Sequence, residues 1–406
     1  MLVQRGPERW GIVDAQNMKR HHTVRRTPFP SSATSPLVPP IVPSAVFVAR
    51  DADHMNAVYE GQEQGFTYAR EGSPNAELLA AKIAALEGAE RGLVASSGMS
   101  AVAAILLGLL KSGDHIVAGN QLYGRTLRLV SQELPRLGVA TDLVDATDIA
   151  AVEAAVRPNT RLVLVEVVSN PLLRVVDVSA LSVVARSRGV LLVVDNTFPT
   201  PLGLRPLSLG AHVVFHSITK MLAGHSDVTL GAVCGSPEFI APIRDTIVTW
   251  GLNGSAFDCW LAERGMNTLE LRVARANANA AALAEFLGRQ PCVHRVFYPG
   301  RTDHPDHAVA RRLFGDQHGN MVTFEVGGGR SAVNRFMRAL DSIPFAPTLG
   351  DVATMISHPA VTSHRGLTAE AREALGIHEG IIRVSVGIEE FSLLKDEFRA
   401  ALEVLK

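Results

Sequence analysis

The chain has 406 residues, of which 47% are hydrophobic, and its 39 Lys and Arg residues nearly balance its 40 Asp and Glu residues. A chain of this length can form two domains around a large core. The balanced charge gives no indication of a nucleic-acid or membrane partner, and the longest apolar stretch, residues 101–110, is too short to cross a bilayer. The three cysteines, Cys234, Cys259 and Cys292, contain no Cys-x-x-Cys pair, so the sequence predicts neither a disulfide framework nor a metal site.

Residues 1–65 are predicted to form an N-terminal arm. Residues 1–59 lack sustained periodicity, and prolines are frequent from Pro28 to Pro43, which favours extended backbone. Such an arm cannot bury itself alone, so it is either disordered or lies along a partner. Its start is basic but has no apolar core, which argues against a secretory signal. A transit peptide remains an alternative, and the cytoplasm is the expected compartment.

Strands and helices alternate over residues 66–258, which are predicted to form a large domain. Continuous apolar runs of this kind are typical of parallel strands buried on both faces, and their alternation with helices indicates an α/β fold with a mainly parallel sheet. Helices are expected at Ala76–Leu86 and Ser100–Leu110. The expected strands are Arg91–Ala95, His115–Ala118, Ala140–Val144, Arg161–Val168, Val190–Val194 and Val213–Phe215.

Two polar side chains follow neighbouring strand patterns in this domain. Asp195 ends the run Val190–Val194, and Lys220 comes shortly after Val213–Phe215. Ligands of open α/β sheets bind beyond the carboxyl ends of the strands, so we expect both groups to face one cleft. A lysine amine can form a Schiff base with pyridoxal 5'-phosphate (PLP), while a carboxylate keeps its pyridine nitrogen protonated. A surface lysine and a turn-capping aspartate are the alternative.

A short turn, Ser97-Gly98-Met99, joins the strand Arg91–Ala95 to the following helix. Backbone N–H groups at the start of a helix have no partner within it, and they lie at the positive end of the helix dipole. The turn is therefore a phosphate site in principle, although any strand-to-helix turn has some of these properties.

Ser217-x-Thr219-Lys220, followed by Gly224-His225-Ser226-Asp227, resembles the Schiff-base segment of the Cys/Met-metabolism PLP enzymes. That family includes cystathionine γ-synthase, cystathionine γ-lyase, methionine γ-lyase and the homoserine-ester sulfhydrylases. The resemblance runs from about Phe66 to the C-terminus. It implies PLP-dependent fold type I, an amino-acid substrate, and a homodimer or homotetramer with shared active sites whose N-terminal arm crosses a subunit interface.

The resemblance also implies roles for single residues. Tyr123 matches a tyrosine that stacks on PLP and takes part in proton transfer, and Asn170 matches an asparagine near the cofactor ring and the substrate carboxylate. Tyr68 and Arg70 match residues that reach the cofactor phosphate of the neighbouring subunit. The remaining implied cofactor contacts are Lys220, which is also catalytic, Asp195, Ser97, Gly98, Met99, Ser217 and Thr219.

Residues 259–406 are predicted to form a smaller α+β domain. A helical pattern covers Cys259–Gln290 and is interrupted only at Gly265. Strands are expected at Arg295–Tyr298, Met321–Val326 and Ile381–Val386, with helices at Ser331–Leu340, at Thr368–Leu375 and from Glu389.

A charged residue, Arg383, interrupts the apolar run of the last strand, and a charge there is costly unless it is paired. The resemblance implies that Arg383 binds the substrate α-carboxylate and that Thr348 lies in the loop beside it. An edge-strand arginine that faces water is the alternative.

The resemblance implies either γ-replacement on an O-activated homoserine, with a thiol or another nucleophile, or γ-elimination to a 2-keto acid and ammonia. Pro347 stands where cystathionine-handling members commonly have Glu, which disfavours cystathionine as the substrate. Arg125 stands where methionine γ-lyases carry Cys, which disfavours methionine γ-lyase activity. Arg128 matches an arginine common in cystathionine γ-synthases and γ-lyases. We expect Arg125 and Arg128 to recognise an anionic γ-substituent; the alternative is that both face solvent.

The sequence disfavours two functions from other classes. An NAD(P)-dependent oxidoreductase would need a glycine fingerprint early in the sheet, and the sequence has none there. A catalytically inactive PLP-fold binding protein would be expected to have lost Lys220, Asp195 or Arg383, and all three are present.

Overall fold

The structure is a computed structural model that describes residues 32–405. The chain divides into two units, Met1–Pro40 and Ile41–Lys406. Within the first unit, residues 32–40 form no helix or strand, and the basic start of the arm, Pro28 and Pro30 lie outside the described residues. No helix within residues 32–405 is long and apolar enough to cross a membrane.

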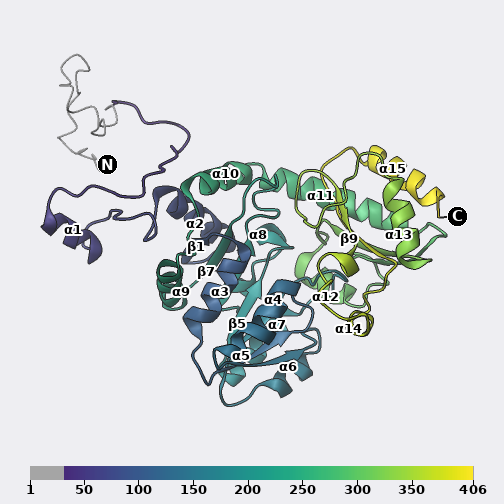
Figure 1. Cartoon of the computed structure of the whole chain (residues 1–406), viewed down its shortest axis with the longest axis horizontal. Coiled ribbons are helices and arrows are strands. Elements are labelled where there is room, and N and C mark those ends of the chain that lie inside the picture. Colours follow the sequence, from purple (N-terminus) through teal and green to yellow (C-terminus); the bar gives the residue numbers. More distant parts are fainter. Residues whose placement is uncertain (1–31, 406) are drawn as a thin grey trace. The chain divides into compact units, whose positions relative to one another are not determined.

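A seven-stranded sheet organises the second unit (Figure 1). Its order is β1 (Arg91–Ala95), β7 (Gly231–Gly235), β6 (Val213–Ser217), β5 (Leu191–Asp195), β4 (Thr160–Glu166), β2 (His115–Gly119) and β3 (Ala140–Val144). The strands from β6 to β3 are parallel, whereas β7 is antiparallel to both of its neighbours. The mainly parallel sheet is therefore confirmed. Strand β7 was not predicted, because glycines at both of its ends give it a weak strand signal.

Helices cover both faces of this sheet (Figure 1). On β4, Leu162 and Leu164 pack into a core with α3 (Gly98–Leu109) and α9 (Pro237–Trp250), while Val163 and Val165 pack into another with α7 (Val178–Arg188). Burial on both faces explains why the strands read as continuous apolar runs. The other helical segments of this region are α2 (Pro74–Glu87), α4 (Gly124–Arg128), η3 (Leu129–Glu133), α5 (Leu134–Arg136), α6 (Ile149–Ala155), α8 (Thr200–Gly203), η4 (Pro206–Leu209) and α10 (Ala256–Met266).

A four-stranded antiparallel sheet follows in the order β10 (Met355–Ser357), β11 (Ile381–Ser385), β9 (Met321–Val326) and β8 (Val293–Phe297). It packs with α11 (Leu269–Leu287), α13 (Gly329–Arg338) and α15 (Phe391–Glu403) around a core that includes Phe324, Phe336 and Phe398. The remaining segments are α12 (His307–Phe314), η5 (Pro359–Val361) and α14 (Ala369–Ala374). The predicted domain boundaries after residues 65 and 258 stay a prediction.

Two local expectations differ from the structure. The helical pattern Cys259–Gln290 is two helices, and the break falls between Met266 and Leu269 rather than at Gly265, which lies buried inside α10. The Thr268 hydroxyl donates to the Gly265 carbonyl there, which offers the backbone an alternative to a continued helix. A helix, α1 (Ala52–Tyr59), also occurs within the described residues 32–59, and its first turn is capped by Asp51.

Candidate active site

A cavity of about 830 Å³ lies at the carboxyl ends of β4, β5 and β6. Its lining residues come from the region of the large sheet and from residues 347–349, 361–367 and 383 in the region of the small sheet. Thirteen of the sequence-predicted site residues line it: Ser97, Gly98, Met99, Tyr123, Arg125, Arg128, Asn170, Asp195, Ser217, Thr219, Lys220, Thr348 and Arg383. Tyr68 and Arg70 are not among its lining residues.

Lys220 lies in the turn that follows β6, where its N–H donates to the Ser217 carbonyl. Its Nζ donates to Thr348 Oγ1 at 3.0 Å. Burial, and secondarily the nearby charge of Arg383, lower the pKa of Lys220 to about 8. An amine with that pKa is uncharged in a substantial fraction of molecules near neutral pH, so it can act as a nucleophile or a base.

Two carboxyl groups lie side by side at the ends of β5 and β4, because Asp195 pairs in register with Glu166. Burial raises the pKa of Asp195, and hydrogen bonds from the Thr197 N–H and hydroxyl oppose this shift. Burial, followed by the charge of Asp195, raises the pKa of Glu166 well above its usual range. The pair therefore holds one negative charge more readily than two, and a buried cationic N–H would compensate it.

The turn before α3 forms a narrow cradle. Ser97 caps the helix by accepting a hydrogen bond from the Ser100 N–H at 3.0 Å, while the N–H groups of Gly98 and Met99 precede the first intrahelical bonds. A Cβ on Gly98 would lie 2.9 Å from Ser217 Cβ, so a larger residue would crowd this wall. The cradle suits a phosphate group, which N–H groups at a helix start bind well.

Arg383 lies on β11, between β10 and β9, and is only 4% exposed. The alternative of an edge-strand arginine facing water is therefore wrong. Its Nη1 donates to Asn170 Oδ1 at 2.9 Å and its Nη2 to the Thr348 carbonyl at 3.0 Å, while the buried Nε has no partner among the described residues. Burial lowers the pKa of Arg383 to about 10, which still leaves it charged at neutral pH. An unsatisfied buried donor on a guanidinium is well placed to receive a carboxylate.

These groups match the needs of PLP: an amine of lowered pKa, a buried carboxylate and a cradle of backbone N–H groups. The model for Cys/Met metabolism PLP-dependent enzymes matches residues 22–403. The chain belongs to this family. The family and the PLP cofactor predicted from the sequence are thus confirmed.

Individual members of the family cover nearly the whole chain. This chain is 40% identical over 373 residues to L-methionine gamma-lyase of Pseudomonas putida, and the matched region covers 90% of this chain and 92% of that protein. It is 41% identical over 359 residues to O-succinylhomoserine sulfhydrylase of Pseudomonas aeruginosa, with coverages of 88% and 89%. The structure of cystathionine gamma synthase from Xanthomonas oryzae pv. oryzae with aminoacrylate and cysteine superimposes with a TM-score of 0.87 at 37% identity, covering 92% and 94%. The expected PLP fold and enzyme class are therefore confirmed.

Three arginines with exposed side chains, Arg125, Arg128 and Arg365, line the cavity and are called its rim. Arg125 lies in α4 and has no side-chain hydrogen bond or ion pair within residues 32–405, while Arg128 makes only a 3.4 Å contact with Glu133. Arg365, in the segment after η5, is exposed and also lacks a side-chain partner in the described part of the chain. The two segments touch, because a Cβ on Gly124 would lie 2.5 Å from the Ser363 carbonyl oxygen.

Several polar residues of the site were not found from the sequence. Glu166 lies within the predicted strand Arg161–Val168 and ends β4 in the structure, so a carboxylate inside an apolar run was the available signal. Arg365 carries no motif, since its loop comes beside α4 only in the folded chain. Within the single chain, Tyr68 and Arg70 contact each other, and the Arg70 guanidinium carbon lies 5.1 Å from the Tyr68 ring centre.

Proposed function

We propose that this enzyme catalyses γ-replacement on an O-activated homoserine that carries an anionic ester, with a thiol as the nucleophile. The observation that carries the proposal is the rim, where the exposed Arg125, Arg128 and Arg365 line the cavity and two of them have no partner in the described chain. Guanidinium groups bind carboxylates and phosphates in two-pronged contacts. The relative named O-succinylhomoserine sulfhydrylase supports an ester of this kind.

Arg383 would hold the substrate α-carboxylate through its free Nε and the remaining Nη hydrogens, while Asn170 and Thr348 fix its plane. Asp195 would keep the cofactor's ring nitrogen protonated, and the Ser97–Met99 cradle would take its phosphate. When bound, PLP supplies an electron-poor ring that accepts the electron pair released at the substrate Cα.

Lys220, once displaced by the substrate amine, would remove the Cα proton, a task that suits an amine with a pKa of about 8. A second proton then leaves Cβ as the γ-oxygen bond breaks and the ester group departs as its free acid. The thiol sulfur adds at Cγ and its proton is returned to the substrate carbon chain, with Lys220 and Tyr123 as the available proton carriers. The products are a thioether amino acid and the acid of the ester.

Elimination at Cγ is the second candidate, because a relative of 40% identity is named L-methionine gamma-lyase. In that reaction water, instead of a thiol, ends the sequence and gives a 2-keto acid and ammonia. The rim favours replacement, since the position where such lyases carry Cys is Arg125 here. An inactive binding protein is disfavoured, because Lys220 and Asp195 line the cavity with shifted pKa values.

We also propose that the active site is completed by a second copy of the chain, in a homodimer or a homotetramer, in the cytoplasm. The phosphate cradle consists of neutral groups, and Tyr68 and Arg70 lie outside the cavity of their own chain. Their side chains are exposed and would reach a neighbouring subunit.

The test is a substrate panel with the purified holoenzyme: O-succinyl-, O-phospho- and O-acetylhomoserine, each with and without cysteine or sulfide. The expected product is a thioether from an anionic ester, formed only when the thiol is present. A 2-keto acid formed at the same rate with and without thiol would favour elimination. No turnover of any ester by enzyme that carries PLP on Lys220 would reject both.

A further inference from the structure

The loop between β4 and α7, residues 167–177, joins the two sheets beside the cavity. Its Asn170 accepts the hydrogen bond from Arg383 on β11, and its Pro171 carbonyl accepts one from Thr323 on β9 at 2.7 Å. The position of this loop therefore decides where Asn170 meets the guanidinium of Arg383.

Within the loop, Arg174 lies directly opposite Ser169, the residue before Asn170. The Ser169 N–H donates to the Arg174 carbonyl at 2.9 Å, and the Arg174 N–H donates to Ser169 Oγ at 3.1 Å. Val168 and Val175 form a β-bridge next to them. A shift of Arg174 is thus passed through short backbone contacts to Asn170.

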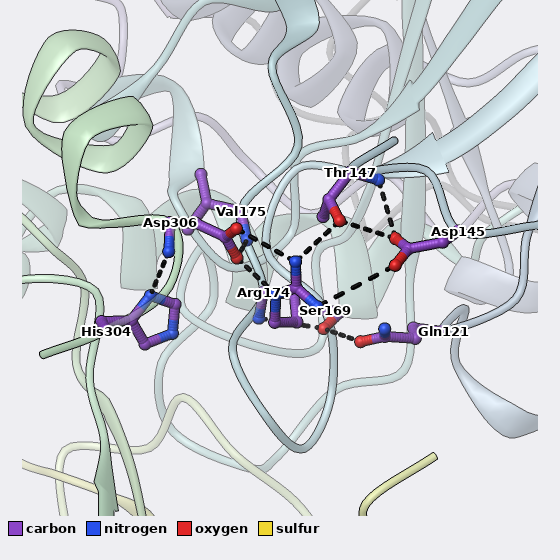
Figure 2. Close-up of polar contacts among 8 residues, drawn as sticks. All are labelled: Gln121, Asp145, Thr147, Ser169, Arg174, Val175, His304 and Asp306. Atoms are coloured by element: carbon purple, nitrogen blue, oxygen red, sulfur yellow. Dashed lines mark hydrogen bonds and ion pairs between the residues drawn. The ribbon is translucent and has the colours of Figure 1, made fainter. Parts of the chain in front are cut away.

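Arg174 is itself held from outside the loop by Asp306, as Figure 2 shows. Its Nε donates to Asp306 Oδ2 at 2.6 Å and its Nη2 to Oδ1 at 3.1 Å, while the Val175 N–H donates to the same carboxylate at 3.0 Å. On the other side, Nη2 donates to Thr147 Oγ1 at 2.7 Å. The Asp306 side chain is nine-tenths buried and that of Arg174 is about three-quarters buried, so this two-pronged contact is partly shielded from water and fixes orientation as well as distance.

We propose that the Arg174–Asp306 ion pair is a positioning element: it holds Asn170 where its Oδ1 fixes the plane of the Arg383 guanidinium, and so sets the affinity for the substrate α-carboxylate. The inference rests on the carboxylate-binding role proposed for Arg383. Two-pronged recognition of a carboxylate requires both N–H groups to point at its oxygens, and displacements near 1 Å in such sites can cost about a hundredfold.

A second ion pair provides a matched control. Arg312 on α12 donates to the Asp177 carboxylate that caps α7, so it links the same two parts of the chain. Neither residue hydrogen-bonds to Ser169, Asn170 or Arg174. Loss of the Arg312 pair therefore removes an ion pair at the far end of the same loop without removing a hydrogen bond to Ser169, Asn170 or Arg174.

The experiment compares two ligands that differ only by a carboxylate, L-norvaline and n-butylamine, through the change that each causes in the absorbance of the bound cofactor. In holoenzymes with Asp306→Asn or Arg174→Gln, the Kd of L-norvaline should rise about tenfold or more, since a misplaced guanidinium loses a charge-assisted contact. The Kd of n-butylamine should stay unchanged, and Arg312→Gln should leave both ligands unaffected. For the reacting ester, KM should rise more than kcat falls.

Arg383→Lys separates this inference from the proposed function. It should weaken L-norvaline and spare n-butylamine; if it spares both, the carboxylate site and the positioning role are both overturned. If Arg383→Lys weakens L-norvaline but Asp306→Asn does not, the positioning role alone is overturned. Equal weakening of the two ligands in Asp306→Asn would also overturn it. Should that variant fail to fold, Arg174→Lys, which keeps the charge but loses the two-pronged contact, is expected to show the same selective loss.

Discussion

Replacement of Arg125 by Gln removes one rim charge and leaves a shorter, uncharged polar side chain. A charge-assisted hydrogen bond to a desolvated ligand contributes about 1.5–3 kcal/mol, whereas exposed ion pairs contribute about 0.2–1 kcal/mol. Arg125 is exposed, although it lines the cavity, so its contribution should fall between these ranges, near 1–1.5 kcal/mol. We therefore expect kcat/KM for O-succinylhomoserine to fall about fivefold to tenfold.

The assay measures kcat/KM for O-succinylhomoserine and for O-acetylhomoserine, whose ester is uncharged, at low and at high salt. The neutral ester should be nearly unaffected by Arg125→Gln. The selective loss should shrink in 1 M salt, where charges are screened over about 3 Å. Arg365→Gln should show the same pattern, and the double variant a larger one. Equal losses on both esters, or a loss independent of salt, would refute anion recognition at the rim.

Three further predictions concern the interior and the assembly. In cofactor-free protein, the rate of PLP addition should rise with pH through an inflection near 8, since only the uncharged Lys220 amine reacts. Arg383→Gln should move that inflection to higher pH, because the Arg383 charge contributes to the lowered pKa of Lys220. An inflection near 10.5 in the parent would contradict the lowered pKa. Mixing inactive Lys220→Ala and Arg70→Ala subunits should restore part of the activity if sites are shared, and demonstrated hybrids without activity would exclude sharing. Glu87→Ala should lower the unfolding free energy by about 1–3 kcal/mol, seen as a lower Tm, because it removes the 2.6 Å partner of the fully buried His216 and the 2.8 Å acceptor of Asn196.

The catalytic end of the site was readable from the sequence for a physical reason. Asp195 ends one continuous apolar run and Lys220 follows another, and such runs by themselves indicate strands buried on both faces. The turn at Gly98 likewise has a short motif of neighbouring residues. What could not be read depends on contacts between distant segments. Arg174 and Asp306 are 132 positions apart in the sequence, and neither belongs to a pattern.

Short elements were missed for a different reason. Strand β10 has three residues, and β7 has glycines at both ends, so hydrogen bonding to longer neighbours rather than intrinsic preference makes them strands. The proposed partnership of Tyr68 and Arg70 with a second chain rests on the family resemblance, because a single copy gives these residues no place in the cavity.

The contact between Gly124 and Ser363 has a consequence for how substrate preference could diverge among related enzymes. The chemistry is anchored at strand ends, whereas the rim is formed by a short helix and a loop that abut there. Substitutions in the loop can exchange one leaving group for another without disturbing the strand ends. A side chain at position 124, in contrast, would push the loop that contains Ser363 outward and change all contacts at the rim. As long as Gly124 is kept, substrate preference can change only through the side chains of the loop.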